Sequence, residues 1–124
     1  MKILIYIGGF YCLAFAIFHL AFWKLFDWKT ELPKLNAINR GVMQVLNLRL
    51  TYVFLVCAFL SFFYTSDLLT TDLGKTVLAA ISLFCLMRAI EQPIFWKFKD
   101  AVSVAFFVVF LFGAAIYFLP LVLQ

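Results

Sequence analysis

Long apolar runs separated by short polar connections dominate the chain. Four of these runs are long enough to cross about 30 Å of hydrocarbon as helices, which takes roughly 20 residues each. They are about twice the length of a barrel strand, and they do not alternate apolar with polar residues. The pattern therefore predicts an all-α integral membrane protein, a single up-and-down bundle of four transmembrane helices. The predicted spans cover residues 3–26, 41–64, 76–98 and 101–123.

The composition agrees with this class. Hydrophobic residues make up 67% of the 124 residues and charged residues only 13%, which is more apolar surface than a soluble domain of this size can bury. The net charge of +4 comes from basic residues near the ends of the predicted spans, and not from a basic stripe of the kind that binds nucleic acid. We therefore expect membrane lipids, and no nucleic acid, as partners. The three cysteines all fall inside spans, where they act as small apolar residues.

The basic residues are distributed unevenly among the connections. Most lie in or beside the first and third connections, whereas the middle connection has two aspartates against one lysine. Because Lys and Arg are enriched in cytoplasmic loops, we predict a cell-membrane protein with residues 27–40 and 97–100 in the cytoplasm and both termini outside. The tryptophans, which favour membrane interfaces, lie at the same side of the predicted bundle. These residues are Lys24, Lys29, Lys34, Arg40, Lys97 and Lys99, with Trp23, Trp28 and Trp96.

A weak internal repeat relates the first and third spans. When residues 11–27 are aligned with residues 84–100, they match at 8 of 17 positions, including a shared Phe-Trp-Lys sequence near the end. Apolar spans also resemble one another by chance, so the match is either a duplicated helical hairpin or a coincidence of composition. A parallel duplication requires the first and third spans to run in the same direction, which the charge distribution also predicts.

Two prolines bear on the helix boundaries. Pro33 suits the first turn of a helix, so an amphipathic extension over residues 34–41 is predicted to precede the second span. Pro93 either lies inside the third span as a kink, which membrane helices tolerate, or ends that span at Gln92. The repeat favours the kink.

A polar stripe enters the second span from the predicted cytoplasmic side, and it consists of Asn36, Arg40, Gln44, Asn47 and Thr51.

Titratable residues inside the spans are the best indication of function, because a charge at membrane depth costs about 2.5–3.5 kcal/mol and usually has a partner or a task. His19 shares a helix face with small residues that allow close packing, so it is predicted to point into the bundle. Two polar residues of the second span are adjacent on one face, and three of the third span share another. The candidate binding residues are His19, Arg49, Tyr52, Arg88, Glu91 and Gln92.

Charge balance restricts how these residues can pair. Glu91 is expected to pair with Arg88 or Arg49, because an unpaired buried charge is costly. One positive charge is then left over, which indicates an anionic ligand, a lipid phosphate or an arginine that snorkels to the interface. His19 by itself is more often a packing residue than a ligand, although a histidine beside Glu91 can relay protons. We recognise no Ser-His-acid set, metal cluster or phosphate loop, so no catalytic residue, metal or cofactor is predicted.

Three functions are compatible with this pattern. The leading hypothesis is a small transporter, channel or binding module, whose polar site opens to the cytoplasm and takes an anionic small molecule or a lipid headgroup. One alternative is a membrane enzyme that acts on a lipid or hydrophobic substrate with His19 or Glu91 as acid or base, although an enzyme is the less favoured class. The other is an accessory subunit whose polar cluster only fixes helix register. Because one small bundle buries little surface, we also expect a homo-oligomer, most simply a dimer.

Overall fold

The computed structural model describes residues 1–123, and over these residues it contains helices and no strands. The helices are α1 (Lys2–Leu20), α2 (Phe22–Leu25), α3 (Trp28–Glu31), the 3₁₀ helix η1 (Leu32–Lys34), α4 (Ala37–Phe63), α5 (Thr65–Thr70), α6 (Asp72–Phe95) and α7 (Ala101–Val122). Within this part of the chain, α1, α4, α6 and α7 are the helices long and apolar enough to span a membrane. The predicted all-α class with four membrane-spanning helices is therefore confirmed.

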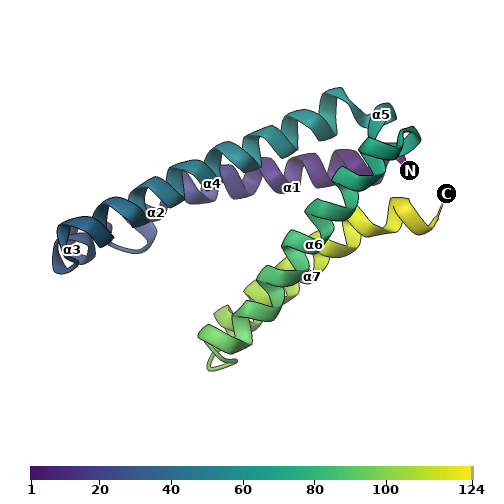
Figure 1. Cartoon of the computed structure of the whole chain (residues 1–124). Helices are drawn as coiled ribbons and strands as arrows, with labels where there is room; N and C mark the ends of the chain where they lie inside the picture. The colour runs from purple at the N-terminus through teal and green to yellow at the C-terminus, as the bar shows by residue number, and fades with distance from the viewer. Residues whose placement is uncertain (124) are drawn as a thin grey trace.

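The long helices form two antiparallel hairpins that diverge like the limbs of a V (Figure 1). In one hairpin α1 packs along α4, and in the other α6 packs along α7. The hairpins meet where α5 turns the chain from α4 into α6, and both termini lie near this closed end. At the opposite, open end lie α2 and α3 of the first hairpin and the turn between α6 and α7. Helices α1 and α6 therefore run in the same direction, as a duplicated hairpin requires.

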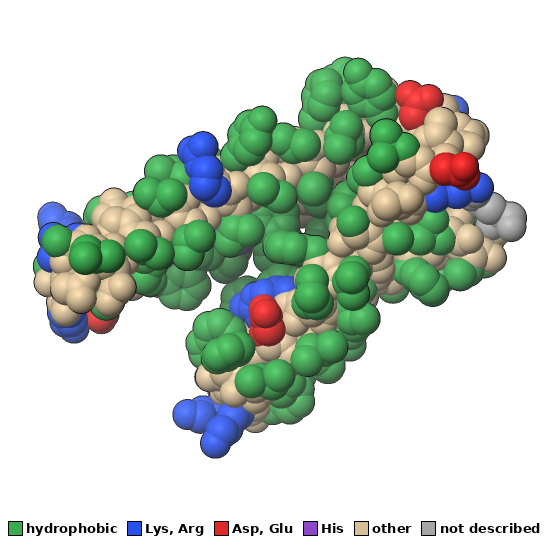
Figure 2. All heavy atoms as spheres, viewed as in Figure 1, with side chains coloured by type: hydrophobic (Ala, Val, Ile, Leu, Met, Phe, Trp, Pro, Cys, Tyr) green, Lys and Arg blue, Asp and Glu red, His purple; other side chains and the backbone are tan. Residues whose placement is uncertain are grey.

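Apolar side chains cover much of both hairpins on the face shown in Figure 2, as contact with lipid requires. Basic side chains gather at the two free ends of the V. Lys29 and Lys34 belong to the free end of the first hairpin, and Lys97 and Lys99 to that of the second. By the distribution of positive charge, the open end of the V is the end expected at the cytoplasmic face.

The connection within the first hairpin divides the first predicted span, residues 3–26. Helix α1 ends at Leu20, α2 is a separate short turn, and Asp27 adopts a left-handed conformation with φ of 51° that redirects the chain. Trp28 and Leu32 are buried and anchor the connection against the helices. The span is therefore shorter as a continuous helix than its hydropathy indicates, because the last apolar residues form part of the connection.

Helix α4 begins at Ala37, slightly later than the predicted amphipathic extension. The Asn36 side chain caps it by accepting a hydrogen bond from a backbone N–H of the first turn at 2.8 Å. Arg40 then closes the preceding connection, because its guanidinium donates to the carbonyl oxygens of Leu32 and Leu35 at 3.2 and 3.0 Å. The polar residues at this end of the stripe thus order the connection.

Side-chain caps also begin the helices of the second hairpin. Thr71 Oγ1 accepts a hydrogen bond from Gly74 N, and Asp100 Oδ1 accepts one from Ser103 N, both at 2.9 Å. Helix α6 continues through Pro93 into a further turn, so this proline lies inside the helix. The structure therefore places Pro93 inside the third span, as the repeat predicted, and the span does not end at Gln92.

The two hairpins are related position by position. Helix α6 matches α1 in the register that aligns Cys85 with Cys12, and α7 matches α4 in the register that aligns Phe110 with Phe54. The second hairpin thus corresponds to the first without residues 28–44, which form α3, η1 and the first turns of α4. Buried positions also coincide between the two hairpins, as a tandem duplication would predict. The buried pairs include Ile5/Leu78, Cys12/Cys85, Ala16/Ala89, His19/Gln92, Asn47/Ser103, Phe54/Phe110 and Ala58/Ala114.

A buried tyrosine joins the hairpins near the closed end of the V. Tyr117 of α7 is 0% exposed, and its hydroxyl lies 2.8 Å from Ser61 Oγ of α4 and 3.2 Å from Cys12 Sγ of α1. Gly8 of α1 admits the ring, because a Cβ at this position would lie 2.5 Å from Tyr117 Cζ. Ser61 and Tyr117 occupy aligned positions of the two hairpins, in the register that pairs Phe110 with Phe54.

Candidate functional site

His19 is buried in the first hairpin, as its small-residue face predicted. Its Nδ1 lies 2.7 Å from the carbonyl oxygen of Phe15, and because that oxygen can only accept, Nδ1 carries a proton. The ring packs on Phe22 and Phe54 at centroid distances of 4.5 and 5.1 Å. His19 is therefore held by its own helix and by aromatic packing, and no residue among 1–123 forms a hydrogen bond with its Nε2.

Asn47 connects α4 to α1 at the level of His19. Its Nδ2 donates to the carbonyl oxygen of His19 at 3.0 Å, and this acceptor fixes which end of the amide is the donor. Asn47 is 7% exposed, and within residues 1–123 no donor reaches its buried Oδ1. A buried acceptor without a donor costs about 1–3 kcal/mol. This oxygen is therefore available to a water molecule or to a hydrogen-bond donor of a ligand.

The second hairpin contains the equivalent polar contact. Gln92 is equivalent to His19 and donates through Nε2 to Ser103 Oγ at 3.0 Å, and Ser103 is equivalent to Asn47. Ser103 Oγ in turn donates to the carbonyl oxygen of Lys97 in the turn before α7. Each hairpin thus joins its two helices by a buried polar contact at the same depth. In the first hairpin the acceptor is backbone, whereas in the second both groups are side chains.

Arg88 lies one turn before Gln92 on α6 and is half-buried. Its Nη1 donates to Gln92 Oε1 at 3.1 Å, and its guanidinium carbon lies 4.9 Å from the ring centroid of Trp96 and 4.5 Å from that of Phe110. Cation–π attraction to the two rings partly offsets the loss of hydration. Of the five N–H donors of a guanidinium, only one is used in hydrogen bonds within residues 1–123. The guanidinium is therefore fixed in place, and its other N–H donors form no hydrogen bond within residues 1–123.

The other predicted site residues do not join this arrangement. Arg49, Tyr52 and Glu91 are exposed, and over residues 1–123 none of their side chains forms a hydrogen bond or an ion pair. The expected pairing of Glu91 with Arg49 or Arg88 is not formed. The ion pair found in the described part of the chain joins Lys34 and Glu31 at 3.3 Å in the exposed connection. The structure thus brings Arg88 and Gln92 together, places His19 in the other hairpin, and leaves three candidates at the surface.

Helix geometry explains the position of Arg49. At about 100° per residue it lies about 200° around the helix from Asn47, so it faces away from α1 when Asn47 faces α1. The polar stripe and Arg49 therefore point in opposite directions. Within the stripe, Gln44 Nε2 donates to the carbonyl oxygen of Arg40 at 3.2 Å and Thr51 Oγ1 to that of Asn47 at 2.9 Å. These bonds run along α4 itself, which indicates a structural role.

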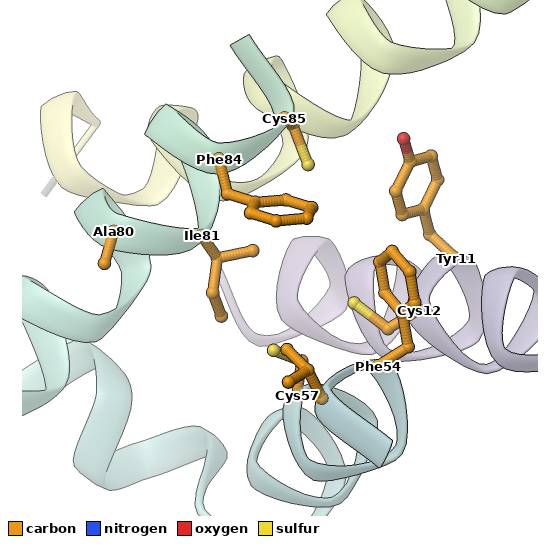
Figure 3. A pocket seen from close by; sticks show the side chains of 9 residues that line it. Tyr11, Cys12, Phe54, Cys57, Ala80, Ile81, Phe84 and Cys85 are labelled. Carbon is orange, nitrogen blue, oxygen red and sulfur yellow. The ribbon is translucent and has the colours of Figure 1, made fainter. Parts of the chain in front are cut away.

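Two parts of the site lay outside the sequence prediction. Tyr117 belongs to the most apolar span, where it was not considered, and its alignment with Ser61, in the register that pairs Phe110 with Phe54, is the signal that would have found it. The sequence presents the cysteines as isolated apolar residues, but all three line one cavity of about 190 Å³ between α1, α4 and α6 (Figure 3). Their common position depends on how the hairpins pack, which the spacing of the cysteines does not reveal.

The arrangement is suited to binding. It places a fixed guanidinium beside an apolar cavity, whereas the proposed acid–base residues His19 and Glu91 belong to different hairpins and no hydrogen bond joins them in the described structure. Among residues 1–123, no three His, Cys, Asp or Glu side chains are placed to hold a metal ion. Neither a protein-family model, nor a curated protein, nor a solved structure matches this chain.

Proposed function

We propose that this protein is a membrane binding module for an anionic group, which Arg88 holds in the open part of the V. Arg88 carries the proposal, because it is a half-buried cation whose remaining N–H donors have no acceptor within residues 1–123. In a membrane such a charge is costly unless it is paired. A phosphate or carboxylate would supply the countercharge and accept two hydrogen bonds from the planar guanidinium.

The surroundings of Arg88 favour an anion that arrives from the open end. Trp96 and Phe110 both contact the guanidinium, so its orientation is set before the ligand binds. Lys97 and Lys99 lie at the free end of the same hairpin and attract negative charge towards it. Positive charge predicts that this end faces the cytoplasm, so the ligand would enter from the inner leaflet or the cytosol.

The ligand is either the headgroup of an amphiphile or a free anion, and one titration separates them. The protein in phosphatidylcholine nanodiscs is titrated with dodecyl phosphate, with inorganic phosphate and with dodecanol, and its thermal unfolding is followed. A ligand at about 100 times its Kd stabilises the native state by about 2.7 kcal/mol. We expect dodecyl phosphate to raise Tm more than dodecanol does, and a rise with inorganic phosphate alone would indicate a free anion.

Two arginine variants make the experiment specific. Arg88→Gln should lose the response to phosphate, and Arg88→Lys should keep part of it, since an ammonium retains the charge but not the planar pair of donors. Arg49→Gln is the matched control, because it removes the same charge from the exposed face of α4. An equal response in the wild type and in Arg88→Gln would refute the proposal and leave a structural role for Arg88.

Transport is a second candidate function, favoured by the unequal ends of the V. The hairpins separate towards one end and are joined at the other by the buried pair Ser61 and Tyr117. A carrier that is open to one side has this form. Flux of a labelled alkyl phosphate across reconstituted vesicles, absent in Arg88→Gln, would support transport, whereas binding without flux would leave the binding module alone.

A further inference from the structure

The α1–α7 contact between the hairpins is tight because two glycines admit two tyrosines. The hydroxyl of Tyr11 donates to the carbonyl oxygen of Val109 at 3.0 Å, and its ring lies against Gly113, where a Cβ would lie 2.5 Å from Tyr11 Cζ. The ring of Tyr117 lies against Gly8 in the same way. Close approach at small residues is a common means of joining membrane helices. This interface therefore has both the shape and the hydrogen bond to hold its helices together.

The equivalent interface between α6 and α4 lacks these features. A phenylalanine, which has no hydroxyl to donate, replaces the first tyrosine, and a serine replaces the second. Isoleucine and cysteine side chains replace the two glycines and keep the backbones apart. Helices α4 and α6 accordingly diverge, whereas α1 and α7 pack together (Figure 1). The aligned pairs, with the α1–α7 residue first, are Tyr11/Phe84, Tyr117/Ser61, Gly8/Ile81 and Gly113/Cys57.

The divergence leaves the apolar cavity of about 190 Å³. In Figure 3, Ile81 and Phe84 of α6 and Cys57 of α4 surround the same space, and Tyr11 and Cys12 of α1 close it from the third side. An apolar cavity of about 150 Å³ can stay dry and bind a benzene-sized molecule. The present cavity is therefore large enough for an aromatic ring or a short length of hydrocarbon chain.

The cavity and Arg88 are neighbours on one helix. Phe84 and Cys85 line the cavity, and Arg88 follows one turn later on α6, towards the open end of the V. Residues three and four apart on a helix lie on the same side of it. A molecule with an anionic head and an apolar tail would thus satisfy the guanidinium and the cavity at the same time.

We propose that the cavity between α1, α4 and α6 is the tail site of an anionic amphiphile whose head Arg88 holds. This inference rests on the proposed function, and it identifies the ligand as a molecule with one hydrocarbon or aryl tail beside its phosphate or carboxylate. The tail displaces no protein group, because it occupies the space left where the second interface lacks its tyrosine and glycine contacts.

The cysteines provide a direct test of occupancy, because all three line the cavity. Cys57 is half-buried and the other two are buried. A variant with Cys12→Ala and Cys85→Ala therefore reports the alkylation of Cys57 alone. In nanodiscs, dodecyl phosphate at about ten times its Kd should slow alkylation by N-ethylmaleimide about tenfold. Butyl phosphate, which shares the head but has a much shorter tail, should protect far less.

A second measurement avoids dependence on that double variant. Ala80→Phe fills the cavity from its α6 side in the otherwise native chain, and it should weaken binding of dodecyl phosphate at least tenfold towards the affinity of butyl phosphate. Ala14→Phe is the matched control, because Ala14 is also exposed but lines a separate cavity with Phe18 and Phe106. That control should bind dodecyl phosphate as the native chain does.

The outcomes distinguish the tail site from the head site. If binding depends on Arg88 but neither Cys57 alkylation nor Ala80→Phe responds, the tail lies elsewhere and this inference is wrong while the proposed function stands. If dodecanol protects Cys57 as well as dodecyl phosphate does, and Arg88→Gln changes neither, the cavity takes any apolar chain. Both the inference and the proposed function would then be wrong.

Discussion

The hydroxyl groups of Ser61 and Tyr117 lie 2.8 Å apart, and the two residues occupy equivalent positions of the duplicated hairpins. Ser61 Oγ also donates to the carbonyl oxygen of Cys57 in its own helix at 2.8 Å, so its proton is already used and Tyr117 acts as the donor between them. Near the closed end of the V, a tyrosine of one hairpin therefore donates a hydrogen bond to a serine of the other.

Removal of this hydroxyl should weaken the contact between the hairpins without disturbing the packing. We expect Tyr117→Phe to lower the free energy of unfolding by about 1 kcal/mol. In a double-mutant cycle with Ser61→Ala, the coupling energy should be about 0.6 kcal/mol, the usual size for hydrogen bonds between membrane helices. Reversible unfolding in mixed micelles measures both values. Strictly additive effects would mean that the two hydroxyls do not interact.

A methyl group at Gly113 should separate α1 from α7. A Cβ there would lie 2.5 Å from the ring of Tyr11, so Gly113→Ala should destabilise the protein by about 1–3 kcal/mol through overpacking. Gly41→Ala is the matched control, since a Cβ at Gly41 would meet no atom within 4 Å. In a helix interior this control should gain about 0.5–1 kcal/mol. Unfolding energies that fall together in both variants would argue against the close contact at Gly113.

Asn47 should be the most sensitive residue of the polar stripe. Asn47→Ala removes the bond from Nδ2 to the carbonyl oxygen of His19, and with a water molecule as the donor to Oδ1 in the native protein we expect it to cost about 1 kcal/mol. Asn47→Asp should cost more, because an ionised carboxylate would place an acceptor against that acceptor in a buried site. Gln44→Ala, which loses only a bond along α4, should change the unfolding free energy by less than about 0.5 kcal/mol. An equal loss at residues 44 and 47 would contradict this assignment.

The orientation that we predict from the charge distribution is testable with single cysteines. We expect Asp67→Cys to react with an impermeant maleimide from outside intact cells, and Lys29→Cys to react only after the membrane is opened. The native cysteines all lie within membrane-spanning helices, so they give little background. Labelling of residue 29 from outside would reverse the orientation, and with it the side from which the ligand is proposed to enter.

Sequence periodicity predicts much of this fold because lipid is a uniform surrounding. The lengths of the apolar runs give the four spans, and the small residues Gly8, Cys12 and Ala16 correctly place His19 inside the structure. Arg49 is exposed because it lies on the opposite face of α4 from Asn47, and its proximity to Tyr52 on the helix does not reveal this. Two residues on opposite faces of one helix do not both point towards the same neighbour.

The shape of the site required knowledge of which helices pack together. Phe84 and Cys57 are unremarkable as apolar residues of their spans. Their contribution to the cavity is recognised only when the α4–α6 interface is compared with the α1–α7 interface, where Tyr11 and Gly113 occupy the aligned positions. The same holds for Arg88, whose contact with Phe110 depends on the packing of α6 against α7. Periodicity identifies which face of each helix is buried. Which helices pack together then determines the residues that this face contacts.

The presence of two similar hairpins in a single chain has a consequence for how such a site can form. If two separate copies of one hairpin formed a symmetric dimer, each contact would occur twice, so both interfaces would be tight or both would be hollow. Fusion removes this constraint, because a substitution then changes one interface and leaves its counterpart intact. Gly8 and Ile81 are aligned positions of the two hairpins. Under the proposed function, the first contributes to the contact between the hairpins, and the second lines the cavity for the ligand.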